Sequence, residues 1–83
     1  MPTVAIVDGV KIQFFFGDHP PAHFHVDFAG ARAQIRLADL EVIEGYLPAA
    51  KLLAVRRWAA PRHRELRSCW EKAVANQNPG KVE

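Results

Sequence analysis

The chain has 83 residues, of which 49% are hydrophobic, and its formal net charge is +2. This length predicts one small domain with thin stability, which a homodimer or a protein partner would improve, and the apolar share indicates a packed core rather than disorder. No apolar run approaches the roughly 20 residues of a membrane span. The first four residues show no positive segment that leads into the apolar block and cleavage site of a secretory signal, so we expect a cytoplasmic protein without membrane contacts.

The first half of the chain predicts a small, mostly antiparallel sheet of about four strands. Residues 3–7 and 10–16 are apolar runs joined by an Asp-Gly turn, which is a strong hairpin signal. Residues 23–28 alternate strictly between polar and apolar side chains, and an Ala-Gly turn leads from them into a fourth strand at 32–37. The same alternation in the second strand predicts that Phe16 faces the core.

The second half of the chain predicts two helices. Residues 38–47 are a turn followed by a short extended piece, and the apolar spacing of three and four predicts helices at about 48–58 and 60–75, each with a proline in its first turn. The helices should cover the phenylalanine side of the sheet. We therefore expect an α+β fold with one domain over 1–75 and a flexible C-terminal tail over 76–83.

Three of the four histidines lie within seven residues, around a Pro-Pro turn. In the strand that follows this turn, the period of two places His23, His25 and Asp27 on one face, while His19 lies in the turn itself. The apolar side chains between them need a core. We therefore expect the imidazoles to gather on the side of the sheet that faces away from the helices.

Three kinds of chemistry fit this face. His19, His23 and His25, with Asp27, have the residue types and spacing of a divalent transition-metal site. The same three histidines are candidate catalytic residues, because one imidazole that takes a proton and another that gives one can cleave RNA through its 2′-hydroxyl. The face is also suited to binding a ligand by stacking. Against all three, a His-x-His pair on an exposed strand is often only solvated.

Charge is divided unevenly along the sequence. Residues 1–50 carry a net charge of −3, whereas residues 51–72 carry +5. Such asymmetry favours contact with a polyanion or an acidic partner protein, although a solvated helix face explains it equally well. The candidate nucleic-acid-binding or partner-binding residues are Arg32, Arg36, Arg56, Arg57, Arg62, Arg64 and Arg67.

Four parts of the sequence carry a family resemblance. They are Met1 to Thr3, Asp18 to Val26, Asp39 to Pro48, and a closing group of Trp58, Glu65, Leu66 and Trp70. In this order they resemble the bacterial domain-of-unknown-function family 4160, over residues 1 to about 74. The basic stretch from Pro61 to Arg64 departs from the more acidic pattern of that family.

The resemblance implies a function that the residues alone do not. Members of the family look like the toxin half of type II toxin-antitoxin pairs, the DhiT-like toxins, so this chain would be a toxin neutralised by a small cognate antitoxin protein. His19, His23 and His25 match signature positions of the family. We expect a toxin that acts on RNA or another nucleic acid through its histidine cluster, with nuclease-like chemistry; the alternative is a non-catalytic metal- or partner-binding module.

Overall fold

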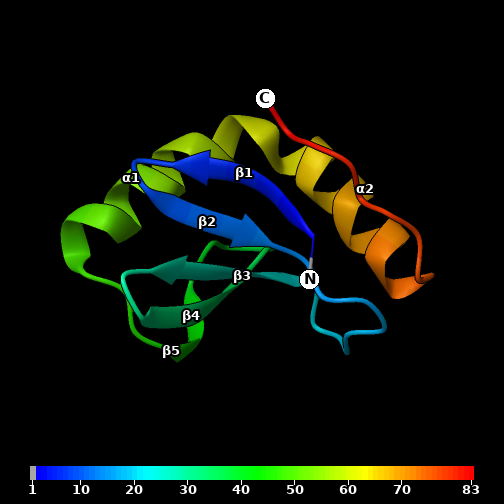
Figure 1. Ribbon diagram of the computed structural model, residues 1–83, viewed down its shortest axis with the longest axis horizontal. Coiled ribbons are helices and arrows are strands. Elements are labelled where there is room, and N and C mark those ends of the chain that lie inside the picture. The colour runs from blue at the N-terminus through cyan, green and yellow to red at the C-terminus, as the bar shows by residue number, and fades with distance from the viewer. Residues whose placement is uncertain (1) are drawn as a thin grey trace.

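The computed structural model describes residues 2–83, and Met1, the first residue of the expected domain and of the family resemblance, lies outside the described residues. The fold is α+β, as expected: a five-stranded antiparallel sheet is followed by one long, bent helix that packs against it (Figure 1). The elements are β1 (Thr3–Val7), β2 (Val10–Gln13), β3 (His23–Phe28), β4 (Ala31–Arg36), β5 (Val42–Gly45), α1 (Ala49–Ala59), the 3₁₀ turn η1 (Ala60–Arg62) and α2 (His63–Val74).

The sheet is a meander in which each strand pairs with the next strand of the chain. Both predicted two-residue hairpins are confirmed. Asp8 and Gly9 have φ angles of 51° and 82°, and Ala29 and Gly30 have φ angles of 50° and 89°. Positive φ at both central residues is the backbone of the turn whose twist matches that of the flanking strands. The pairs β1–β2 and β3–β4 are therefore held in register by local turns, whereas β2 and β3 are joined by the longer loop 14–22.

Alternation in β3 separates the core from the opposite face of the sheet. Phe24 and Val26 are 0% and 1% exposed and lie in the core, together with side chains of the bent helix such as Val55 and Leu66. Apart from the start of β3, where Trp70 of α2 approaches His23, no helix among residues 2–83 covers the opposite face of the sheet (Figure 1). Nor is any helix of this part of the chain long and apolar enough to span a bilayer.

Three details differ from the sequence-based expectation. The short extended piece becomes a fifth strand, β5. The two helices run on through η1 as one bent helix, because proline fits the first turn of a helical segment and Pro61 lies in that turn. The second strand ends at Gln13, three residues early, so Phe16 is 49% exposed instead of buried.

Residues 76–83 carry no regular secondary structure and run beside β1 and α2 (Figure 1). The Val82 N–H donates to the Val4 carbonyl oxygen at 2.9 Å, and the Val82 side chain is 8% exposed. The Cys69 Sγ lies 3.6 Å from the Pro79 carbonyl oxygen. Burial raises the pKa of the Cys69 thiol, so this residue packs as a small hydrophobic side chain.

Gly45 is required where β5 meets β4. Its φ is +80°, and a Cβ atom at this position would press against the backbone carbonyl oxygen of Arg32. The next residue uses the same oxygen, since the Tyr46 N–H donates to it at 2.9 Å. A side chain at residue 45 therefore meets both backbone strain and a steric clash.

We expect Gly45→Ala to destabilise the protein more than Gly30→Ala. Both glycines have positive φ, which costs alanine about 1–2 kcal/mol, but a Cβ atom at Gly30 has no neighbour within 4 Å. The clash at Gly45 adds about 1–3 kcal/mol. Urea unfolding of the two variants measures the difference; equal losses of unfolding free energy would show that the approach to Arg32 carries no cost.

Candidate functional site

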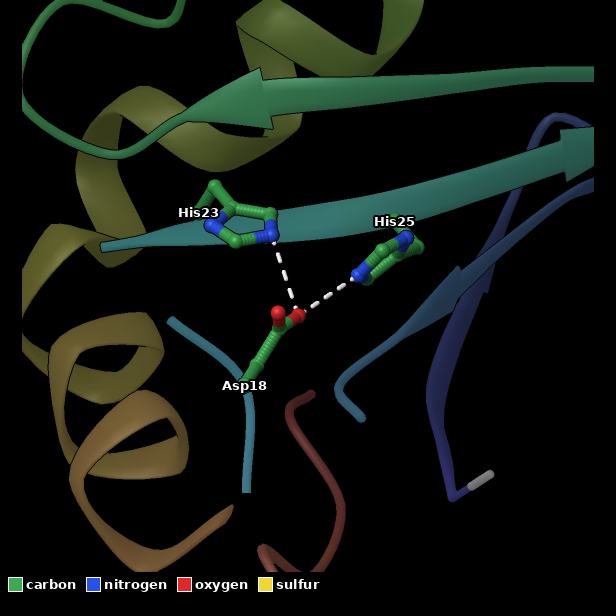
Figure 2. A group of neighbouring side chains, drawn as sticks. All are labelled: Asp18, His23 and His25. Carbon is green, nitrogen blue, oxygen red and sulfur yellow. Dashed lines mark hydrogen bonds and ion pairs between the residues drawn. The ribbon is translucent and has the colours of Figure 1, made fainter. Parts of the chain in front are cut away.

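One carboxylate and two imidazoles converge at the start of β3 (Figure 2). His23 and His25 leave the same face of the strand, and Asp18 reaches them from the loop between β2 and β3. The Asp18 Oδ2 atom lies 3.0 Å from His23 Nε2 and 2.8 Å from His25 Nε2. We call these three residues the Asp18 cluster.

Hydrogen bonds to α2 and within the loop itself hold the loop that carries Asp18. The Gly17 N–H donates to the Ala73 carbonyl oxygen of α2 at 3.0 Å. Within the loop, the His19 N–H donates to Asp18 Oδ1 at 2.9 Å, which fixes the orientation of the carboxylate. The Asp18 side chain therefore caps its own turn and, with its other oxygen, faces the histidines.

Neighbouring aromatic rings enclose the cluster. The Phe15 ring stacks on the His25 ring with centroids 3.7 Å apart. The Trp70 ring of α2 lies 5.2 Å from the His23 ring, and His23 is only 5% exposed. The expectation that both imidazoles lie away from the helix is thus wrong for His23, because the loop and α2 close over the first residue of β3.

The buried ring of His23 has one nitrogen bonded and one nitrogen free. Nδ1 lies 2.7 Å from the Pro21 carbonyl oxygen, which accepts only, so Nδ1 carries the proton and donates. Nε2 is buried and has no hydrogen-bond partner among the described residues, although Asp18 Oδ2 is close to it. Its direction misses the geometry of a hydrogen bond. In the neutral ring, a lone pair therefore faces the carboxylate without a proton between them.

Two opposing effects act on the carboxyl group of Asp18. Burial by itself raises its pKa. The hydrogen bond with His25, the hydrogen bond from the His19 N–H, and the positive charges of His23 and His25 when protonated all lower it, and the net pKa lies below the ordinary value of 3.8. The cluster therefore stabilises a negative charge at Asp18.

The Asp18 cluster has the donor set of a metal site. One ligand atom from each residue lies within 4.8 Å of the other two. Around a tetrahedral ion with bonds of about 2.0–2.1 Å, ligand atoms are separated by about 3.3 Å, which small rotations of these side chains would reach. Metal-free acid–base chemistry fits less well, since it needs two accessible imidazoles, and here both Nε2 atoms face the same carboxylate.

Of the four metal ligands proposed from the sequence, the structure brings two together and leaves two apart. His23 and His25 come together, but His19 is exposed in the loop and is not part of the cluster. Asp27 is not part of the cluster either, because its carboxylate pairs with the Arg32 Nε at 3.2 Å on the neighbouring strand. Asp18 is not among the metal ligands proposed from the sequence, yet it is the carboxylate of the cluster. Its place within the histidine-rich segment was the signal for its second contact.

The arginines form no single surface. Arg36 pairs with Asp39 at 2.7 Å, and Arg56 pairs with Glu41 at 3.3 Å. Arg62 donates to the backbone oxygens of Trp58 and Glu83, each at 2.8 Å. Three others are exposed and have no ion pair within residues 2–83: Arg57, Arg64 and Arg67.

A pocket of about 310 Å³ adjoins the cluster on the uncovered face of the sheet. His25 and Phe15 belong to its wall, so the pocket and the Asp18 cluster share one imidazole. The remaining lining residues are Gln13, Val26, Asp27, Arg32, Ala33, Gln34, Glu44 and Gly45.

Comparison with known proteins gives one match. The family model described as "Domain of unknown function (DUF4160)" matches residues 9–71 and therefore includes the whole Asp18 cluster. β1 and the chain after residue 71 lie outside this match. No curated protein and no solved structure matches the chain. The match supplies a family but no activity.

The lowered pKa of Asp18 predicts how acid changes stability. Its folded pKa lies below its unfolded pKa, so its contribution to the unfolding free energy is complete above about pH 4 and is lost as the pH falls through the folded value. We expect the stability difference between the metal-free wild type and Asp18→Asn to shrink from pH 6 to pH 3 in urea unfolding.

His19→Ala is the control for this measurement, since it keeps the backbone N–H that donates to Asp18. It should follow the pH dependence of the wild type. A constant difference between wild type and Asp18→Asn across this pH range would contradict the prediction.

Proposed function

The chain belongs to the DUF4160 family, and we propose that its function is to bind a divalent transition-metal ion through Asp18, His23 and His25. One observation carries this proposal. The Nε2 atom of His23 is buried, lacks a hydrogen-bond partner among the described residues, and faces a carboxylate and a second imidazole. A buried polar atom without a partner costs about 1–3 kcal/mol, which a bound cation would offset.

The surroundings of His23 support its role as a ligand. Metal-binding histidines usually donate their second ring N–H to a carbonyl or carboxylate oxygen, which fixes the tautomer and the ring orientation. The hydrogen bond from His23 Nδ1 to the Pro21 carbonyl oxygen does this here, at 2.7 Å. The Phe15 stack restrains the orientation of the His25 ring. Both imidazoles are therefore oriented by the fold itself.

The donor set selects a class of ion. Two imidazole nitrogens and one carboxylate oxygen suit zinc and its first-row neighbours, whereas magnesium and calcium prefer oxygen ligands. Three protein ligands leave at least one coordination position for water or for a substrate, as in catalytic zinc sites. The side chains of His25 and Asp18 are 14% and 18% exposed, which gives solvent a route to that position.

We expect chelator-treated protein to bind one Zn²⁺ or Co²⁺ per chain. At a metal concentration of about 100 times the dissociation constant, binding adds about 2.7 kcal/mol of stability, or about 15 °C in Tm for a domain of this size. Calorimetry gives the stoichiometry, and the visible spectrum of the Co²⁺ form reports its coordination. His25→Ala should lower the affinity at least about tenfold.

His19→Ala is the matched control, because His19 lies in the same segment but outside the cluster. It should keep full metal affinity. Absence of metal binding by the wild type, or equal losses in both variants, would overturn the proposal. Asp18→Asn offers a second test of metal affinity, because it removes the carboxylate ligand and leaves the buried imidazole of His23 in place.

A second function comes from the family resemblance, and the exposed arginines support only its nucleic-acid contacts. We propose that the protein is the toxin of a type II toxin-antitoxin pair, that it acts on RNA, and that a small antitoxin neutralises it by direct binding. Arg57, Arg64 and Arg67 project from the bent helix without ion pairs in the described part of the chain, so they are available for phosphate contacts. Such contacts are salt-dependent and insensitive to sequence.

Total RNA incubated with metal-loaded protein tests this second function. We expect cleavage that is lost with chelator and in His25→Ala, and that is kept in His19→Ala. Arg64→Ala should weaken RNA binding and reduce the salt slope by about 0.7. RNA that stays intact in every arm would reject the nuclease chemistry while leaving the metal-binding function in place.

A further inference from the structure

We propose that the pocket beside the Asp18 cluster binds a guanine base. The pocket lies on the face of the sheet that carries His25 and Gln34, and Gly45, which has no side chain, is among the residues that line it. Its walls combine an aromatic ring with charged and amide side chains. This is the combination with which proteins recognise an unstacked base, by stacking and by hydrogen bonds to its edges.

Strand register arranges the polar groups of the pocket in a row. Gln13 on β2 lies opposite His25 on β3, which lies opposite Gln34 on β4, which lies opposite Glu44 on β5. Phe15 stacks on His25, the second residue of this row, and borders the pocket. Because side chains at paired positions lie on the same face of a sheet, the row presents one continuous hydrogen-bonding surface.

Several of these groups remain available for a ligand. The side chains of Gln34 and Glu44 have no hydrogen-bond partner within residues 2–83. Arg32 is 79% exposed and pairs with Asp27 through Nε, so its two terminal nitrogens are free of ion pairs in that part of the chain. The pocket therefore offers a carboxylate that accepts, a guanidinium that donates and an amide that does both.

This set of groups favours guanine over adenine. Guanine has two acceptors on one edge, O6 and N7, which suit an arginine, and N–H donors at N1 and N2, which suit a carboxylate. Adenine has an amino group where guanine has O6 and an acceptor at N1, so Arg32 and Glu44 would meet groups of the wrong kind. Gln34 alone fits both bases. Charge-assisted hydrogen bonds are the stronger ones and decide the preference.

His25 couples the pocket to the proposed metal site. When Nε2 binds a metal, Nδ1 carries the proton, and Figure 2 shows this nitrogen on the side of the ring away from Asp18. Partners of this second nitrogen tune the metal. Only this coupling rests on the proposed metal-binding function, since the guanine contacts themselves come from other residues.

The test is titration of guanosine and adenosine 5′-monophosphates into ¹⁵N-labelled protein, with and without Zn²⁺. We expect chemical-shift changes at Gln34, Glu44 and Gly45, and an affinity for the guanine nucleotide about tenfold higher than for the adenine nucleotide. Ribose 5-phosphate controls for contacts to the phosphate alone. A short single-stranded RNA with one guanine distinguishes a free nucleotide from a base within a strand as the preferred ligand.

Two substitutions that avoid the metal ligands sharpen the test. Glu44→Gln should abolish the preference for guanine, whereas Glu65→Gln, an exposed acid on α2, should leave it unchanged. Equal binding of both nucleotides, no binding of either, or shifts confined to the helix arginines would overturn the proposal. Guanine binding in a protein that takes up no metal would uphold the pocket and refute the metal site.

Discussion

The burial of Phe24 and Val26 against the bent helix is the constraint on which the site depends. Since successive side chains of a strand point to opposite faces, this burial places His23 and His25 on the other face of β3. A shift of one residue in register would exchange the two sets. The cost of exposing a phenylalanine and a valine thus decides which face of β3 carries the imidazoles, while the Pro21 carbonyl oxygen and the Phe15 ring orient the rings themselves.

Around this strand, the site is closed by the loop that directly precedes it and by α2, which is distant in sequence. The loop between β2 and β3 supplies Asp18, and α2 supplies both Trp70 and the carbonyl oxygen that holds Gly17. These contacts exclude water from one imidazole and strengthen electrostatic interactions in the cluster. The same exclusion makes the free nitrogen of His23 costly unless a proton or a cation binds there.

Much of the fold follows from local sequence, and most of the site does not. The alternation of residues 23–28 and the two turns with positive φ at both central residues are short-range features, so they predict the strands and their order. The pairing of Asp27 with Arg32 depends on strand register, and the burial of His23 depends on the path of α2, so local sequence predicts neither. Phe16 shows the same limit, because the end of a strand is set by where the loop must go rather than by alternation. Asp18 was visible as a turn residue, but its bridging contact required the loop to fold back over the sheet.

The contact between Trp70 and His23 has an optical consequence. An indole whose ring centre lies 5.2 Å from an imidazole is close enough for its emission to be quenched by a protonated ring or by a paramagnetic ion bound there. The other tryptophan, Trp58, lies under the guanidinium of Arg62, at a centroid distance of 5.3 Å. The protein thus carries an intrinsic fluorescent reporter beside its histidines and a second, internal reference fluorophore elsewhere in the fold.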